Sequence, residues 1–233
     1  MRMNNRINVI GVFEKLFDYY GPQGWWPGQN RLEICLGAIL TQNTSWNNAE
    51  KALKNLKSYG ICSIEDLRVI PDSTLAHLIY PSGYFNSKTR TIKEFVRMIS
   101  SQYGGSLAQF LDLPVQQLRG NLLEIKGIGD ETADAIILYA AEMPTFVIDS
   151  YTRRIGARMM LPMATKSYSA YRHYFLENLP NDTSILNEFH ALFVRLAKKC
   201  CFKRNPNCNI CPLFSECETG NINRKGRLNL RIT

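Results

Sequence analysis

The sequence predicts an all-α protein. Apolar residues recur about every 3.6 positions in most segments, which is the period of an amphipathic helix. Glycine and proline divide the chain at helix-length intervals, for example at Pro71, Pro81, Gly104 and Pro114. Alternating patterns typical of β-strands are sparse. A chain of 233 residues is long enough for one large domain or two small ones.

The helices are predicted in order along the chain. Residues 7–19 and 31–41 each place their apolar side chains on one stripe. A third helix is predicted to begin after Thr44 or Ser45, either of which can cap it. Ser63 followed by Asp66 is a capping pair for a short helix. The remaining predicted helices cover residues 73–79, 84–101, 106–111, 115–124, 130–142, 150–161 and 184–199.

The charge distribution favours an anionic partner. Lysine and arginine number 28 against 20 acidic residues, a net charge of +8, and nine basic and two acidic residues fall between Arg195 and Thr233. A solvated basic tail would give the same counts. No apolar run approaches the ~18 residues that span a membrane, and the N-terminus lacks the apolar block of a signal peptide. We therefore expect a cytoplasmic protein in a reducing environment, with no membrane partner.

Four of the seven cysteines lie in the segment CFKRNPNCNICPLFSEC, with the spacing C-x6-C-x2-C-x5-C. Four thiolates this close in sequence can surround one metal centre. A single C-x2-C pair with wider flanking gaps suits a [4Fe–4S] cluster better than zinc, which prefers two close pairs; zinc and free thiols are the alternatives. Cys200 is a second candidate for the first ligand. The predicted cluster ligands are Cys201, Cys208, Cys211 and Cys217. We expect the other two cysteines, Cys35 and Cys62, to be small core residues on helices.

This cysteine spacing, at the end of a helical chain of this length, resembles the endonuclease III family of DNA glycosylases. The resemblance runs from about residue 7 to residue 217. It implies two helical domains with a DNA-binding cleft between them. One would be a helical-barrel domain of residues 28–142, and the other would join residues 1–27 to 143–233 and hold the cluster. In that family the cluster is structural and braces a basic loop against DNA, a place that Lys203 and Arg204 would take here.

The segment LLEIKGIGDETADAIILYA, residues 122–140, resembles the helix–hairpin–helix of the same family. Gly127 and Gly129 allow a tight turn, and the free N–H groups of the following helix would bind a DNA phosphate near Lys126. Taken alone, a G-x-G between helices is equally typical of a simple capping turn. The family places its essential aspartate about twenty residues further on, and Asp149 in FVIDSYTRRIG matches that position. Asp149 is also a predicted helix N-cap.

The residue after Asp130 indicates which reaction is carried out. Family members that also cut the DNA strand have a lysine two residues after the second hairpin glycine, and its amine forms a Schiff base with the sugar. This chain has Glu131 there. Lys126 lies across the turn and could not take the lysine's place without a movement of the loop. The resemblance therefore implies a monofunctional glycosylase, unless another lysine supplies lyase activity.

Aromatic residues indicate which damaged bases the protein could accept. The stretch GWWPGQNRLEICLGAILTQNTSW, together with YPSGYFNSKTR, resembles the 3-methyladenine glycosylase branch of the family. The resemblance implies base-pocket residues Trp26, Pro27, Trp46 and Glu131, and a duplex-wedging Gln42. Stacked rings can hold a flipped base, particularly a cationic alkylated purine. Alternatively, each tryptophan could be a core residue. The best-recognised members of this branch lack the four cysteines that this chain has.

The expected partner is double-stranded DNA with a damaged base, bound by a monomer. Alternatives are a bifunctional glycosylase and lyase for oxidised pyrimidines, a mismatch glycosylase, and a non-catalytic DNA-binding iron–sulfur protein. The three histidines, His77, His173 and His190, are expected to be structural or surface residues away from these motifs.

Overall fold

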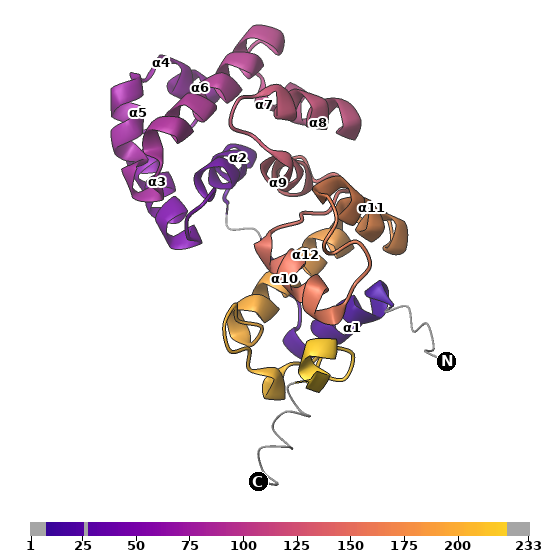
Figure 1. Ribbon diagram of the computed structural model, residues 1–233. Helices are drawn as coiled ribbons and strands as arrows, with labels where there is room; N and C mark the ends of the chain where they lie inside the picture. Colours follow the sequence, from indigo (N-terminus) through magenta and orange to yellow (C-terminus); the bar gives the residue numbers. More distant parts are fainter. Residues whose placement is uncertain (1–7, 26–27, 223–233) are drawn as a thin grey trace. The chain divides into compact units, whose positions relative to one another are not determined.

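The computed structural model describes residues 8–25 and 28–222, and these residues are helical with no strand among them (Figure 1). The all-α prediction is therefore confirmed for this part of the chain. The α-helices are α1 (Val9–Tyr20), α2 (Arg31–Leu40), α3 (Trp46–Ser58), α4 (Ile64–Val69), α5 (Asp72–Leu78), α6 (Phe85–Gln102), α7 (Leu107–Leu111), α8 (Val115–Glu124), α9 (Asp130–Ala135), α10 (Ser150–Met159), α11 (Tyr168–Asn178) and α12 (Thr183–Lys199). Shorter turns are η1 (Tyr80–Ser82), the π-helical η2 (Ile136–Ala140) that continues α9, and η3 (Cys208–Ile210). Every helix in the described ranges is too short or too polar to span a bilayer.

The chain divides into two compact units. Unit 1 consists of Met1–Trp25 and Thr145–Thr233, and unit 2 consists of Trp26–Pro144. The range expected for the helical-barrel domain, 28–142, falls inside unit 2.

Unit 2 is built around α2, which packs against α3, α6, α9 and η2 (Figure 1). Its buried face carries Leu36, Ile39 and Leu40, each no more than 3% exposed. Cys35 lies on the same face and is fully buried, as predicted. The Ser63 cap of α4 is also confirmed, because its hydroxyl accepts a hydrogen bond from the Asp66 N–H at 3.1 Å.

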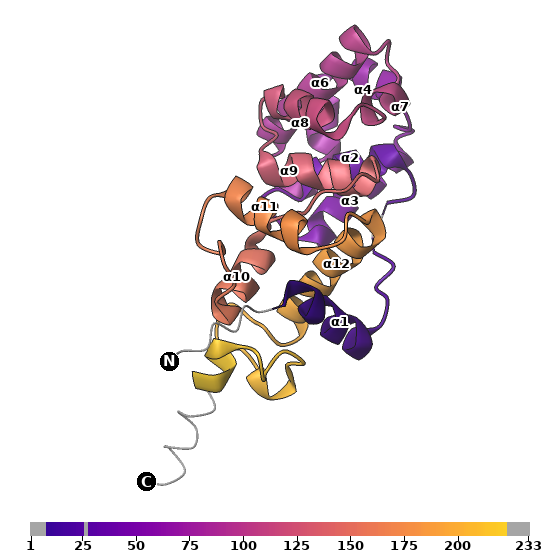
Figure 2. The same cartoon turned by 90° about the vertical axis from the view of Figure 1, so that its right-hand side faces the viewer.

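Unit 1 has an aromatic core. The rings of Phe146 and Phe175 stack at 4.0 Å, and Phe189 packs edge-on against both. Helix α12 supplies Phe189 and contacts α1 and α10; α1 lies beside α12 in Figure 2. This packing positions the N-terminus of α10, where Asp149 lies.

The fold departs from the sequence prediction at Cys62 and at α11. Cys62 is exposed and precedes α4, where its N–H donates to the Asp66 carboxylate, so it is no core residue. Helix α11 was not predicted. Aromatic side chains occur around it without a clear stripe, and only Tyr171 and Phe175, one turn apart, are buried. Periodicity therefore gave no sign of a helix there.

Candidate functional site

Asp149 caps the N-terminus of α10. Its Oδ1 accepts a hydrogen bond from the Thr152 N–H at 2.7 Å, which confirms the predicted capping role. The side chain is 14% exposed and therefore mostly enclosed. A carboxylate at this position is also stabilised by the helix dipole.

The second carboxylate oxygen of Asp149 faces His190. His190 Nε2 lies 3.5 Å from Asp149 Oδ2, and the imidazole is 5% exposed. The expectation that His190 lies away from the sequence motifs is therefore wrong. Residues 149 and 190 are brought together because α10 packs against α12. The one sign of this in the sequence is a polar residue within the apolar run FHALFV, since a buried imidazole needs a polar partner.

These neighbours keep Asp149 ionised. Burial by itself would raise the pKa of Asp149, but the hydrogen bond and charge of His190 and the N–H of Thr152 outweigh it. The pKa of Asp149 is consequently below its ordinary value of 3.8. At neutral pH the group is a carboxylate.

The predicted hairpin joins α8 to α9. Gly127 has φ +99°, and a Cβ on it would lie 2.1 Å from Thr91 Oγ1, so only glycine fits there. Gln42 reaches the hairpin, because its Nε2 donates to the Gly127 carbonyl oxygen at 2.9 Å and to Thr132 Oγ1 at 2.8 Å. Gly129 is the N-cap of α9 in an extended conformation. The structure therefore brings Gln42 and the glycine turn, which lie far apart in sequence, into direct contact.

The acids that follow the hairpin differ in their surroundings. Asp130 Oδ1 lies 2.5 Å from Nη2 of Arg119 on α8. The same guanidinium contacts Asp134, which is fully buried, through Nε at 3.1 Å and Nη2 at 3.2 Å. Glu131 is exposed in the first turn of α9. The charge of Asp130 is therefore compensated within unit 2, and Glu131 lies at the surface in the position that the family resemblance gives to a lysine in strand-cutting members.

The predicted aromatic residues are only partly described. Trp26 and Pro27 lie outside the described residues. Trp46 begins α3 and packs its ring over Gly37 of α2, where a Cβ would lie 3.4 Å from the indole. Much of the Trp46 ring therefore contributes to the packing of unit 2.

The four predicted cysteine ligands surround one small hollow. Cys201, Cys208, Cys211 and Cys217 line it together with Cys200 and Arg158. Nη1 of Arg158 donates to Cys201 Sγ at 3.1 Å, and Cys217 Sγ donates to the Arg158 carbonyl oxygen at 3.4 Å. No disulfide joins any of the seven cysteines, all of which lie within the described residues. Within residues 8–25 and 28–222, no three His, Cys, Asp or Glu side chains form a ligand set for a single metal ion.

Cys200 and Cys201 differ in environment. Cys200 is 1% exposed and its sulfur lies 3.9 Å from the Tyr20 hydroxyl. Cys201 is half-buried and contacts Arg158 on the hollow. Lys203 and Arg204 are exposed in the loop that follows, and the Lys203 carbonyl oxygen accepts from Arg158 Nη2 at 3.1 Å. The two basic side chains are thus presented by a loop whose backbone is held to α10.

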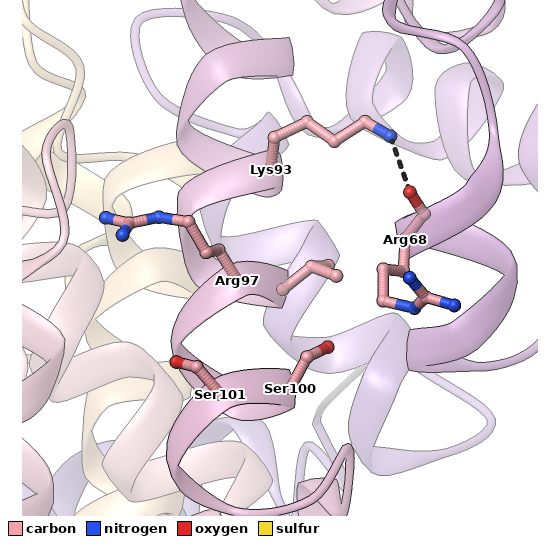
Figure 3. A pocket seen from close by; sticks show the side chains of 6 residues that line it. Arg68, Lys93, Arg97, Ser100 and Ser101 are labelled. Atoms are coloured by element: carbon pink, nitrogen blue, oxygen red, sulfur yellow. Dashed lines mark hydrogen bonds between the residues drawn. The ribbon is translucent and has the colours of Figure 1, made fainter.

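A separate pocket of about 400 Å³ lies in unit 2, where α4 packs against α6 (Figure 3). It is lined by Arg68, Lys93, Val96, Arg97, Ser100 and Ser101. Lys93 points to the backbone of α4, where Nζ donates to the Arg68 carbonyl oxygen at 3.3 Å (Figure 3). Arg68 pairs with Glu65 at 2.6 Å, and Arg97 pairs with Glu94. The cations of this pocket thus have internal partners, and we assign the pocket no role.

Comparison with known proteins identifies the family. Residues 36–181 match the HhH-GPD superfamily of base excision DNA repair proteins. The chain is 38% identical over 219 residues to MJ1434 of Methanocaldococcus jannaschii, which is classed as a candidate DNA repair glycosylase; the match covers 93% of this chain and 99% of that protein. It is 28% identical over 191 residues to endonuclease III of Sulfolobus acidocaldarius, with 82% of each chain covered.

The chain is also similar to solved structures of DNA glycosylases. The 3-methyladenine DNA glycosylase MagIII of H. pylori, bound to 1,N6-ethenoadenine, has a TM-score of 0.73 at 25% identity, with 83% of this chain and 98% of that chain covered. A non-covalent endonuclease III–DNA complex has a TM-score of 0.80 at 18% identity, which shows similarity of fold, with 96% and 100% covered. The chain belongs to the HhH-GPD superfamily of base excision DNA repair proteins, and the predicted resemblance to endonuclease III is confirmed.

Proposed function

We propose that this protein is a monofunctional DNA glycosylase that removes alkylated purines such as 3-methyladenine from double-stranded DNA. The observation that carries the proposal is an ionised, partly exposed Asp149 in a chain whose hairpin presents Glu131 in place of an amine. The similarity to MagIII over most of the chain supports an alkylated purine as substrate.

In the proposed reaction, the carboxylate of Asp149 stabilises positive charge on the sugar while the bond between its C1′ and the base nitrogen breaks. The bonding electron pair leaves with the base, so a cationic purine departs as a neutral molecule and needs no acid catalyst. A water oxygen then bonds to C1′ and loses a proton to solvent. Thr152 fixes Oδ1 of the carboxylate throughout. The products are a free base and an intact strand with an abasic site.

Glu131 supports hydrolysis over strand cleavage. A Schiff base requires an amine nucleophile, and a carboxylate cannot form one. Lys126 lies on the other side of the hairpin, whose backbone is held by the Gln42 contact with Gly127. The loop would have to move for Lys126 to serve as the nucleophile.

DNA is the proposed partner of the hairpin and of the basic loop. The backbone N–H groups in the first turn of α9, after Gly129, suit a phosphate, which gives contacts that do not depend on sequence. Arg119 compensates Asp130 beside this turn and so reduces repulsion of the phosphate. Lys203 and Arg204 are exposed and add positive charge. Gln42, in the proposed wedging position, is fixed by the hairpin itself.

We further propose that Cys201, Cys208, Cys211 and Cys217 hold a [4Fe–4S] cluster. The chemistry of the donors fits, because four cysteine side chains line one hollow and thiolates are the ligands that iron–sulfur clusters take. The cluster would close the loop that carries Lys203 and Arg204. Purified protein should contain about four iron and four sulfide per chain. Zinc without iron would overturn this assignment, and loss of iron in Cys211→Ser would support it.

The enzymatic proposal is tested with a panel of lesion-bearing duplexes, scored separately for free base and for strand breaks. Asp149→Asn preserves a helix cap, because asparagine also caps well, but removes the charge. It should slow base release by about 100-fold or more. Asp182→Asn is the matched control, because Asp182 caps α12 in the same way and takes no part in the site. Equal activity in wild type and Asp149→Asn would refute the catalytic role.

Borohydride trapping on abasic DNA tests the absence of lyase chemistry. Wild-type protein should form no covalent adduct. An adduct would refute the monofunctional mechanism. It would not bear on glycosylase activity, which the base-release assay tests.

A further inference from the structure

His190 is held between aromatic rings in unit 1. The Trp25 ring stacks on the imidazole with a centroid distance of 6.0 Å and an interplanar angle of 19°. Phe146 packs edge-on at 6.3 Å and 88°. With the ring orientation fixed in this way, Nε2 faces Asp149 Oδ2 at 3.5 Å.

The segment that carries Trp25 is also tied to α12. The Gln23 N–H donates to Glu188 Oε1 at 2.5 Å, and Glu188 lies two residues before His190. The Gln23 side chain donates to the Gly21 carbonyl oxygen at 2.9 Å. Helix α12 thus fixes the backbone near Trp25 through Glu188, and Trp25 in turn fixes the ring of His190.

We propose that His190 is a positioning residue for Asp149, and that Trp25 acts with it by holding the imidazole against the carboxylate. This inference rests on the proposed function of Asp149. The Thr152 N–H bonds one carboxylate oxygen, and His190 Nε2 lies 3.5 Å from the other. These two neighbours restrict rotation of the carboxylate about χ2, an angle that is broadly distributed in a free aspartate.

The position of Nε2 suits this role. An N–H on Nε2 points a donor at Oδ2 across the 3.5 Å separation and so favours one orientation of the carboxylate. The carboxylate can then face a sugar cation, and its orientation is fixed before DNA binds. A misplacement of about 1 Å in such a group can cost about 100-fold in rate.

Two substitutions of His190 distinguish the effect of its hydrogen-bond donor from the effect of its ring. His190→Phe keeps a ring for Trp25 to stack on and removes the donor. His190→Gln loses the ring, but its amide nitrogen can take the place of Nε2. The measurements are the single-turnover rate of base release, the dissociation constant for duplex DNA with a stable abasic analogue, and the thermal midpoint.

His190→Phe should lower the single-turnover rate by about 10- to 100-fold with less than about threefold change in the dissociation constant. His190→Gln should recover most of the lost rate. Trp25→Ala should give an intermediate loss, because the imidazole keeps its donor and loses its stacking partner. If His190→Phe does not fold, His190→Asn replaces it, since the shorter amide cannot reach Asp149.

The outcomes distinguish this inference from the proposed function. Full activity of His190→Phe alongside an inactive Asp149→Asn would overturn the positioning role and leave the catalytic aspartate in place. Equal rate losses in the Phe and Gln variants would also overturn it, because a purely structural residue would not be rescued by a donor. Full activity of both Asp149→Asn and His190→Phe would overturn the proposed function itself.

Discussion

Replacing Arg119 with methionine tests how the hairpin tolerates the acids that follow it. Arg119 contacts Asp130, which is 43% exposed, and Asp134, which is fully buried. Methionine keeps most of the side-chain length and removes the charge. Asp134 then loses its guanidinium contact while remaining away from water, and Asp130 loses its compensating charge beside the hairpin.

The expected loss of stability follows from the burial of each pair. Breaking a buried ion pair by removing one partner costs about 3–5 kcal/mol, whereas an exposed pair contributes about 0–1 kcal/mol. The Arg119 side chain is 20% exposed, so the lower end of the buried range applies. We expect a loss of about 3 kcal/mol in the free energy of unfolding, or a fall of about 6–12 °C in the thermal midpoint for a chain of this size. Affinity for duplex DNA should fall about fivefold, or ~1 kcal/mol, because Asp130 is no longer compensated.

The assay is denaturant unfolding followed by circular dichroism, together with DNA binding by fluorescence anisotropy over a range of salt concentrations. Arg97→Met is the matched control, because Arg97 is 74% exposed and pairs with Glu94 on the same helix, so its loss should cost less than about 0.5 kcal/mol. The double variant Arg119→Met with Asp134→Asn should recover part of the loss. A cost below about 1 kcal/mol for Arg119→Met would refute this reasoning.

Two further substitutions test the interior of unit 2. Lys88→Met removes a buried ammonium that donates to two carbonyl oxygens, one at the end of α2 and one in η1, so unfolding at pH 7 should become easier by about 2 kcal/mol. Burial lowers the pKa of Lys88 from 10.5 to about 8. Between these pH values the unfolded chain binds more protons than the folded chain. The stability of wild type relative to Lys88→Met should therefore rise with pH in that window. Gly127→Ala should cost about 1–3 kcal/mol in chemical denaturation and weaken DNA binding, because φ is +99° and the new Cβ would meet Thr91. Gly120→Ala, on α8 with open space around it, should be neutral or stabilising; equal losses in the two glycine variants would contradict the assigned strain.

Local rules predicted the parts of this protein that depend on neighbouring residues. Helical periodicity located α1, α2 and most later helices, and the capping roles of Ser63 and Asp149 followed from residue type and position. The turn at Gly127 was predictable for the same reason, since its positive φ demands glycine. These features are decided within a few residues of chain, where propensity and capping chemistry act.

Contacts between distant residues could not be predicted in this way. The approach of His190 to Asp149 depends on the packing of α10 against α12, and the contact of Gln42 with the hairpin joins residues 85 positions apart. The pairing of Arg119 with Asp130 and Asp134 requires the two helices of the hairpin to be folded first. Such partners become visible only once tertiary structure is known, although a buried polar residue in an apolar run indicates that a partner must exist.

Asp130 and Asp149 show how one residue type serves opposite purposes at two helix starts. Both precede or begin a helix, where the dipole favours a carboxylate. Asp130 faces the guanidinium of Arg119, a permanent cation, so its charge is compensated. Asp149 accepts the Thr152 N–H and faces the imidazole of His190, and these two neighbours orient its carboxylate. In the reaction that we propose, Asp149 is the carboxylate that stabilises the sugar cation, and the neighbours of the two aspartates, rather than the residue type, distinguish their roles.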